Sequence, residues 1–188
     1  MTPQTSQTLK SIAEQLGRSG LCVCTDFLEP AALRAARADL DGLHAAGEFY
    51  RAGTGKGDRL KIQDEVRRDE IHWLERSAAN PVQAALWEKL EALQVEFNQG
   101  LYLGLNDFEG HYAVYPEGGF YRRHLDSFRD DGARVVSIIL YLNLDWKKGD
   151  GGELRVYGKD SSHTDIEPTG GTLVCFLSGE SEHEVLPS

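Results

Sequence analysis

Apolar positions in the N-terminal half of the chain recur at the three- and four-residue spacing of amphipathic helices. The first stripe consists of Leu9, Ile12, Ala13 and Leu16, and it stops near Gly17 and Gly20. The second stripe follows Pro30 and consists of Leu33, Ala36, Leu40 and Leu43. We expect both segments to form helices whose apolar faces cover one side of a sheet.

A third helix has the clearest boundaries. Asn80 is a suitable N-cap residue, Pro81 fits the first helical position, and Gly100 is expected to end the helix. Its apolar stripe consists of Leu86, Leu90, Leu93 and Phe97. Stripes of this kind are packing faces far more often than binding sites, so we expect all three helices to support the fold.

From about Leu103 onward the pattern changes to short runs rich in β-branched and aromatic residues, separated by turns rich in glycine. The expected strands are 111–115, 120–124, 135–142, 153–157, 164–167 and 172–177. Helices followed by many short strands predict an α+β fold. We expect its core to be a double-stranded β-helix (jelly roll) with the N-terminal helices packed on the outer sheet.

The 188 residues fit one domain that is long enough to bury a sizeable core. We expect helical support over about 1–100 and the jelly-roll core over about 103–188. No apolar stretch approaches the roughly 18 residues that a membrane helix needs. The polar first residues do not resemble a signal peptide, so we expect a cytoplasmic protein with no membrane partner. The formal net charge of -10 argues against nucleic acid as a partner.

The cysteines Cys22, Cys24 and Cys175 each lie in an apolar, strand-like run. We therefore expect reduced core residues and neither a disulfide framework nor a metal-binding pair. The segment 51–58 is glycine-rich and charged, but it lacks the Lys-Ser/Thr ending of a phosphate-binding loop. Two interpretations remain open for it: a mobile hairpin loop, or a lid that closes over a substrate.

His124 and Asp126 are two positions apart on an expected strand, so their side chains project to the same face. His183 follows much later, just past another expected strand. Two imidazoles and one carboxylate are the ligand set of non-haem iron(II) sites, and they leave the opposite face of the octahedron open. A second pair, His163 and Asp165, leaves room for only one hairpin before His183, so we expect it at the surface.

Six segments stand out together: RDEIHW (68–73), YPEGGFYRRHLD (115–126), YLNLDW (141–146), GGELR (151–155), DIEP (165–168) and HEV (183–185). They resemble the 2-oxoglutarate and iron(II) dependent prolyl hydroxylases, and most closely the subgroup of the animal oxygen-sensing (hypoxia-inducible factor) enzymes and their bacterial relatives. All six occur in the family's order and spacing and extend over more than half of the chain.

The resemblance implies iron(II) ligation by His124, Asp126 and His183. It also implies that five residues line the 2-oxoglutarate pocket: Tyr115, Ile139, Tyr141, Leu154 and Val185. The two tyrosines can offer hydroxyls to the cosubstrate carboxylate, although each can also be a core aromatic. Arg134 matches a position near the substrate cleft, where the alternative is a solvated arginine that opens a strand.

The activity implied by the resemblance is hydroxylation of a prolyl residue in a protein substrate. Dioxygen and 2-oxoglutarate would be consumed, succinate and carbon dioxide released, and ascorbate would serve as reductant. Asp126 favours hydroxylation over halogenation, because related halogenases lack this carboxylate. Two alternatives remain: a hydroxylase of a free amino acid or other small molecule, and a metal-binding jelly roll without oxygenase activity.

One feature departs from the family pattern. Family members hold the far carboxylate of 2-oxoglutarate with an Arg or Lys a short distance beyond the distal His, and this sequence ends at Ser188. A buried carboxylate without a cation is costly. We expect that the chain is truncated, because the absent segment would also supply a closing strand. A basic residue on another strand, or loss of activity, are the alternatives.

Overall fold

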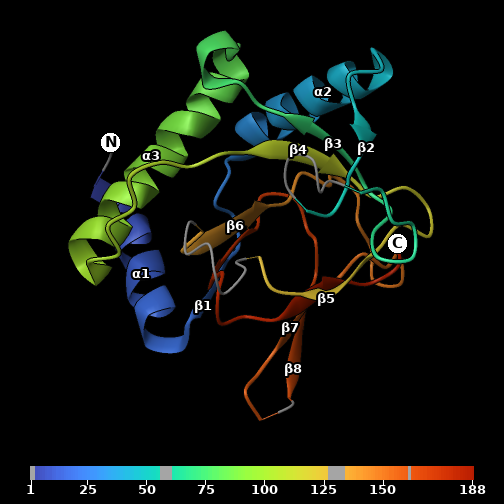
Figure 1. The fold of residues 1–188 in the computed structure, drawn as a ribbon. Helices are drawn as coiled ribbons and strands as arrows, with labels where there is room; N and C mark the ends of the chain where they lie inside the picture. Colours follow the sequence, from blue (N-terminus) through green and yellow to red (C-terminus); the bar gives the residue numbers. More distant parts are fainter. Residues whose placement is uncertain (1–2, 56–60, 127–133, 161) are drawn as a thin grey trace.

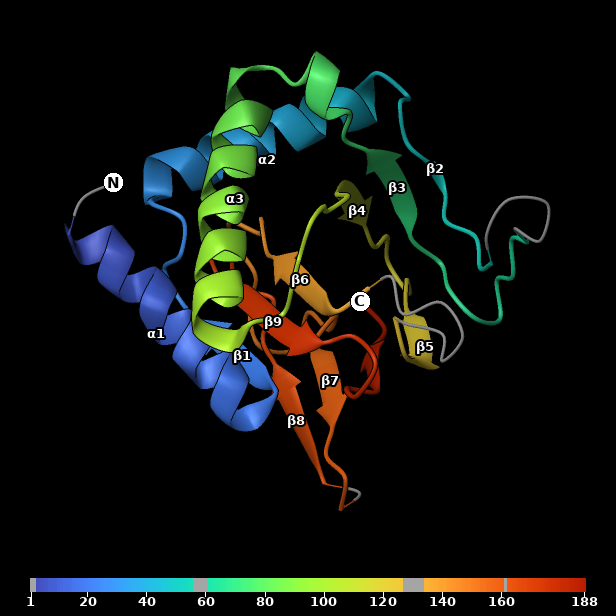
Figure 2. The same cartoon turned by 60° about the vertical axis from the view of Figure 1, so that its left-hand side comes forward.

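The computed structural model describes residues 3–55, 61–126, 134–160 and 162–188, and in the first helix it describes side chains from Thr8 onward. Helices gather on one side of a set of antiparallel sheets (Figures 1 and 2). The helices are α1 (Pro3–Ser19), α2 (Pro30–Ala45), the short 3-10 helix η2 (Arg76–Ala78) and α3 (Pro81–Leu101). The strands are β1 (Leu21–Cys24), β2 (Tyr50–Arg51), β3 (Glu70–Trp73), β4 (His111–Val114), β5 (Tyr121–His124), β6 (Val136–Leu140), β7 (Leu154–Tyr157), β8 (His163–Ile166), β9 (Leu173–Leu177) and β10 (His183–Val185).

Helix α3 confirms the predicted start and shifts the predicted end. The Asn80 side chain accepts hydrogen bonds from the backbone N–H groups of Val82 and Gln83, which completes a capping box. The helix continues through Gly100 because Tyr102, with φ of 55°, is the residue that takes the left-handed conformation at its end.

Two sheets form the jelly-roll core, in the orders β1-β9-β6 and β5-β10-β7-β8. Strand β9 is buried on both faces, and successive side chains alternate between them. Leu173 and Cys175 pack with Phe97 of α3 and other residues of the helices, whereas Val174 and Phe176 pack with the second sheet. The helices therefore cover the outer face of β1-β9-β6, as predicted. Full burial of a side chain such as Phe97 contributes about 1.5–3 kcal/mol.

Residues 1–100 are not purely helical. They also contain β1, which pairs with β9 of the core, and the strands β2 and β3, which form a third sheet with β4 in the order β2-β3-β4. Sequence analysis does not predict β2 and β3, which are two and four residues long. Among the described residues, β4 and β6 each pair on one side only. Within the same ranges, none of the helices has the length and apolar character needed to cross a bilayer.

Cys22 and Cys175 are buried core residues, as predicted, whereas Cys24 is only partly buried. All three are free, and Cys22 on β1 lies directly opposite Cys175 on β9, with both side chains buried. Burial, with the neighbouring Cys24, raises the pKa of Cys22 from its ordinary value of 9.0 to about 11. Burial also raises the pKa of Cys175 well above its ordinary value.

These thiols are therefore expected to be unreactive in the native protein, because the thiolate is the nucleophile. At pH 8, mass spectrometry after brief alkylation should find Cys22 and Cys175 unlabelled until the protein is unfolded. The free energy of unfolding should also fall as the pH rises from 9.0 toward 11, since the unfolded Cys22 thiol ionises first. Rapid labelling of Cys22 or Cys175 in the folded protein would contradict this account.

Candidate metal centre

The structure brings His124, Asp126 and His183 together. One ligand atom from each residue lies within 4.8 Å of the other two, and this is the only such cluster of His, Cys, Asp and Glu within the described ranges. The His124 Nε2 atom lies 3.3 Å from Asp126 Oδ1, and the His183 Nε2 atom lies 3.7 Å from Asp126 Oδ2. The two histidines are paired residues on the adjacent strands β5 and β10. His183 is the first residue of β10, whereas the sequence predicts that it lies just after the end of a strand.

Backbone carbonyls fix the orientation of both imidazoles. The Nδ1 atom of His124 donates to the carbonyl of Arg122 at 2.7 Å, and the Nδ1 atom of His183 donates to the carbonyl of Ser181 at 3.0 Å. A carbonyl oxygen can only accept, so Nδ1 of each ring carries a proton, and Nε2 is left as the atom that can bind a metal. Burial lowers the pKa of His183, which favours the neutral form that a metal requires.

Asp126 is held as a carboxylate. Burial opposes its ionisation, but hydrogen bonding to His124, the nearby His183 and a hydrogen bond from Ser137 outweigh burial and hold the pKa of Asp126 well below its usual range. Ser137 Oγ donates to Asp126 Oδ2 at 2.6 Å and lies 2.8 Å from the hydroxyl of the buried Ser178. Two neutral imidazoles and one ionised carboxylate that converge on one point fit a divalent metal ion, so the donor set passes this chemical test.

Replacement of Ser137 by alanine should weaken metal binding by about 10- to 100-fold, because it removes a hydrogen bond that orients a ligand carboxylate. Titration calorimetry with manganese(II) would measure the change. Ser162→Ala is a matched control, since Ser162 Oγ also donates to a carboxylate, that of the exposed Asp160. Equal affinities for the Ser137→Ala variant and the wild-type protein would contradict a role for Ser137 at the metal.

Four of the five residues expected to line the cosubstrate pocket lie together. They are Ile139 on β6, Tyr141 just after it, Leu154 on β7 and Val185 on β10, and they belong to the apolar cluster between the two sheets. The Phe176 ring of the same cluster lies 4.5 Å from the His183 ring, measured between centroids. The apolar cluster therefore adjoins the metal ligands, and its role as a cosubstrate pocket stays a prediction.

Tyr115, the fifth residue, follows β4 and lies close enough to Tyr141 for their charges to interact. Burial raises the pKa of both tyrosines, so both hydroxyls keep their protons. Neither hydroxyl forms a hydrogen bond to another described side chain or backbone group. Both can therefore donate to the oxygen atoms of a ligand.

Two other predictions concern residues outside the cluster of metal ligands. Arg134 lies just before β6, where it is exposed and donates to Glu109 at 2.6 Å. The second pair, His163 and Asp165, lies on β8 with both side chains exposed, which confirms its predicted surface position. Asp165 accepts two hydrogen bonds from Arg155 and does not contribute to the cluster of metal ligands.

The glycine-rich segment 51–58 is only partly described, because residues 56–58 lie outside the described residues. Thr54 forms a β-bridge with Lys61 on the far side of this loop. The interpretation of the loop as a lid stays a prediction.

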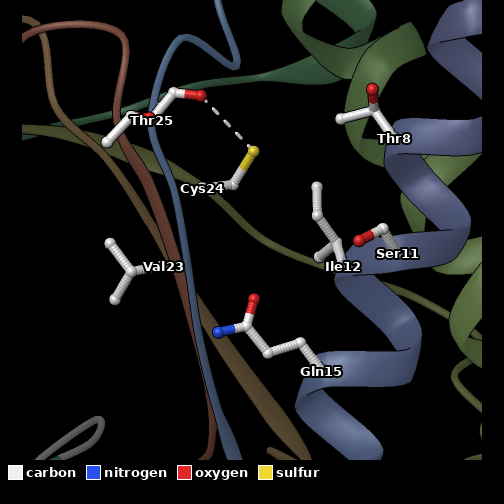
Figure 3. A pocket seen from close by; sticks show the side chains of 7 residues that line it. All are labelled: Thr8, Ser11, Ile12, Gln15, Val23, Cys24 and Thr25. Carbon is white, nitrogen blue, oxygen red and sulfur yellow. Dashed lines mark hydrogen bonds between the residues drawn. The ribbon is translucent and has the colours of Figure 1, made fainter.

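One groove on the surface lies apart from the metal ligands. It lies between α1 and β1, and Figure 3 shows it lined by Thr8, Ser11, Ile12, Gln15, Val23, Cys24 and Thr25. Its one thiol, that of Cys24, donates to the carbonyl of Thr25. Burial, with nearby Asp26, raises the pKa of Cys24, so this thiol is a poor nucleophile. Cys24 therefore gives the groove no reactive thiolate.

Sequence analysis misses a buried ion pair near the site. Arg67 donates to Asp69 through Nε at 2.7 Å and through Nη2 at 2.5 Å, and Asp69 is fully buried. Arg67 also lies near Tyr115 and Tyr121. Asp69 stands inside one of the family-like segments, but nothing in the linear pattern shows that it faces the site. The guanidinium of Arg67 donates two hydrogen bonds to Asp69. Arg67 is therefore not free to anchor a cosubstrate carboxylate.

Comparisons with known proteins agree with this geometry. The model of the 2OG-Fe(II) oxygenase superfamily matches residues 110–188. The chain is 41% identical to a Pseudomonas putida prolyl-4-hydroxylase of known crystal structure, with a TM-score of 0.86, and the match covers 95% of this chain and 91% of that one.

Two animal proteins are also similar. Human Egl nine homolog 1 is 31% identical over 99% of this chain and 45% of its own length, and the chain spans about half the length of the curated relatives it matches. A Trichoplax adhaerens prolyl hydroxylase, solved with a peptide fragment of the hypoxia inducible factor oxygen degradation domain, is 26% identical. That match has a TM-score of 0.84 and covers 98% of this chain and 84% of that one.

The near full-length match to the bacterial enzyme and the convergence of two histidines and an aspartate support one conclusion. The family and the ligand set together imply iron(II) and 2-oxoglutarate as the groups that the site holds. This protein belongs to the 2-oxoglutarate and iron(II) dependent oxygenases, as a dioxygenase of the prolyl 4-hydroxylase type.

Proposed function

We propose that this protein hydroxylates a prolyl residue within a protein substrate and converts 2-oxoglutarate and dioxygen into succinate and carbon dioxide. The observation that carries the proposal is the set of three converging ligands, next to an apolar cluster that includes Tyr141. Support for a prolyl target comes from the similar Pseudomonas putida enzyme, which is a prolyl-4-hydroxylase. Support for a protein substrate comes from the Trichoplax adhaerens enzyme, which was solved with a peptide.

In this proposal His124, Asp126 and His183 hold iron(II), which supplies the redox chemistry that couples decarboxylation of 2-oxoglutarate to hydroxylation of a C–H bond. The backbone carbonyls behind the imidazoles keep both Nε2 atoms aimed at the ion. Ser137 keeps the carboxylate of Asp126 in place.

The pocket residues orient and shield the cosubstrate. Ile139, Leu154 and Val185 exclude water from it, so the electrostatic interactions inside are strong. The hydroxyls of Tyr115 and Tyr141 donate to its carboxylate oxygens. Arg134, on the rim, contacts the substrate segment. Ascorbate keeps the iron reduced, and free cysteines fit a reducing compartment such as the cytoplasm.

The test is incubation of the protein with iron(II), ascorbate, 2-oxoglutarate and a library of proline-containing peptides. We expect succinate release and, by mass spectrometry, a gain of one oxygen atom on a prolyl residue of a subset of the peptides. Asp126→Ala should abolish both signals, whereas Asp165→Ala, in the exposed second pair, should leave them unchanged. Hydroxylation of free amino acids only would support a small-molecule substrate instead. Metal binding without succinate release would support a non-catalytic jelly roll.

A further inference from the structure

Four side chains form a layered column that ends at the metal centre: Asp69, Arg67, Tyr121 and His124. Asp69 binds the guanidinium of Arg67 through two hydrogen bonds. The guanidinium carbon of Arg67 lies 4.1 Å from the centroid of the Tyr121 ring. The Tyr121 ring stacks on the His124 imidazole, with centroids 3.6 Å apart and planes 18° from parallel. Each layer therefore contacts the next over its face.

The first two members of the column, Asp69 and Arg67, form a buried ion pair. The side chain of Arg67 is 13% exposed and that of Asp69 is fully buried. Burial of two charges is costly, and good hydrogen-bond geometry is needed to offset it. Arg67 also donates through Nη1 to the carbonyl of Gly53, and its backbone forms a bridge with Tyr121. The column thus ties the segment between β2 and β3 to the face of a ring that stacks on a metal ligand.

The top of the column limits the remaining freedom of His124. The hydrogen bond from Nδ1 to the carbonyl of Arg122 acts in the plane of the imidazole. The stacked Tyr121 ring restricts movement of the imidazole out of that plane. The cation–π contact from Arg67 in turn holds the Tyr121 ring in place. Two restraints at right angles define where Nε2 points. That direction decides the distance from His124 to an ion shared with Asp126 and His183.

We propose that Tyr121, held in place by Arg67 and Asp69, is a positioning residue that aims His124 at the metal. This inference rests on the proposed function only in assuming that the three ligands bind one divalent ion. It also gives the segment next to β3 a physical connection to the metal geometry. A displacement of Gly53 or Arg67 is passed on through the Tyr121 ring to the His124 imidazole.

The test uses cobalt(II) in place of iron, because its visible absorption spectrum reports coordination geometry without turnover. Tyr121→Leu should change the spectrum of the bound cobalt(II) and weaken its binding by about 10- to 100-fold, the size expected when the support of a metal ligand is lost. Tyr121→Phe, which keeps the ring, should restore both properties. If Tyr121→Leu fails to fold, Tyr121→Met removes the ring at similar volume and should show the same changes.

Tyr157→Leu is the matched control. The Arg123 guanidinium lies 3.8 Å from the centroid of the Tyr157 ring and pairs with Glu182, but Tyr157 does not stack on a metal ligand. Its replacement should leave the cobalt spectrum and affinity unchanged. A Tyr121→Leu or Tyr121→Met protein that is folded and matches the wild type in both readouts would overturn the proposal. A Tyr121→Phe protein as impaired as Tyr121→Leu would also overturn it, since the hydroxyl would then be responsible.

The outcome for the proposed function is separate. A wild-type protein that binds no cobalt would contradict the metal centre itself. A wild type that binds cobalt, with a normal response of the Tyr121 variants but no hydroxylated peptide, would contradict the prolyl substrate and leave the positioning role intact.

Discussion

Replacement of Asp126 by alanine is expected to weaken iron(II) binding by at least about 100-fold and to abolish succinate release, because a direct ligand is lost where even a supporting residue costs 10- to 100-fold. The loss should exceed that of an ordinary side chain for a further reason. Removal of the carboxylate leaves His124 and His183 facing each other, with ring centroids 4.2 Å apart, without the negative charge that favours a bound cation. Anaerobic titration with iron(II) would measure the affinity.

Asp165→Ala is the matched control for this variant, because Asp165 belongs to the other His-x-Asp pair of the chain. Its carboxylate is exposed and bound to Arg155, so its loss should cost at most about 1 kcal/mol of stability and leave iron binding unchanged. Similar iron affinities of the Asp126→Ala and Asp165→Ala proteins would contradict the assignment of the metal centre.

Replacement of Asp69 by alanine is expected to lower the free energy of unfolding by about 3–5 kcal/mol, because it leaves the guanidinium of Arg67 buried without a counter-charge. Urea denaturation would measure the loss. The double variant Arg67→Met/Asp69→Leu should recover most of that stability, since two apolar residues of similar volume need no hydrogen-bond partners.

Arg155 and Asp165 again provide the comparison. Their bidentate pair has nearly the same hydrogen-bond lengths but lies at the surface, so Arg155→Met should lower the free energy of unfolding much less than Asp69→Ala does. Comparable losses for Asp69→Ala and Arg155→Met would show that burial of the Arg67 pair has no energetic consequence. A double variant no more stable than Asp69→Ala would contradict the same account.

The sequence is sufficient to predict the helices, the jelly-roll class and the metal ligands. The stripes of α1, α2 and α3 repeat over several turns, and the continuous apolar run of β9 matches a strand buried on both faces. His124 and Asp126 are close in sequence, although β5 ends at His124 and Asp126 lies just after it, so only the partner His183 had to be located. Its place beside His124 follows from the pairing of β5 with β10.

The remaining parts of the site depend on contacts that local patterns do not record. Strands of two to four residues, such as β2 and β3, are too short for a period to be recognised. Ser137 lies 11 residues from Asp126, and Arg67 meets Tyr121 through a bridge between distant segments. The stack of Tyr121 on His124 accompanies a register irregularity between His183 and Val185. None of these pairings has a spacing that predicts it.

His124, Asp126 and His183 are expected to hold one metal ion between them. Anomalous diffraction from crystals soaked anaerobically with iron(II) tests it most directly. We expect a single strong anomalous peak per chain, bonded to the Nε2 atoms of His124 and His183 and to a carboxylate oxygen of Asp126, and the loss of this peak in Asp126→Ala crystals. A peak at any other position, or none between these three side chains, would contradict the account.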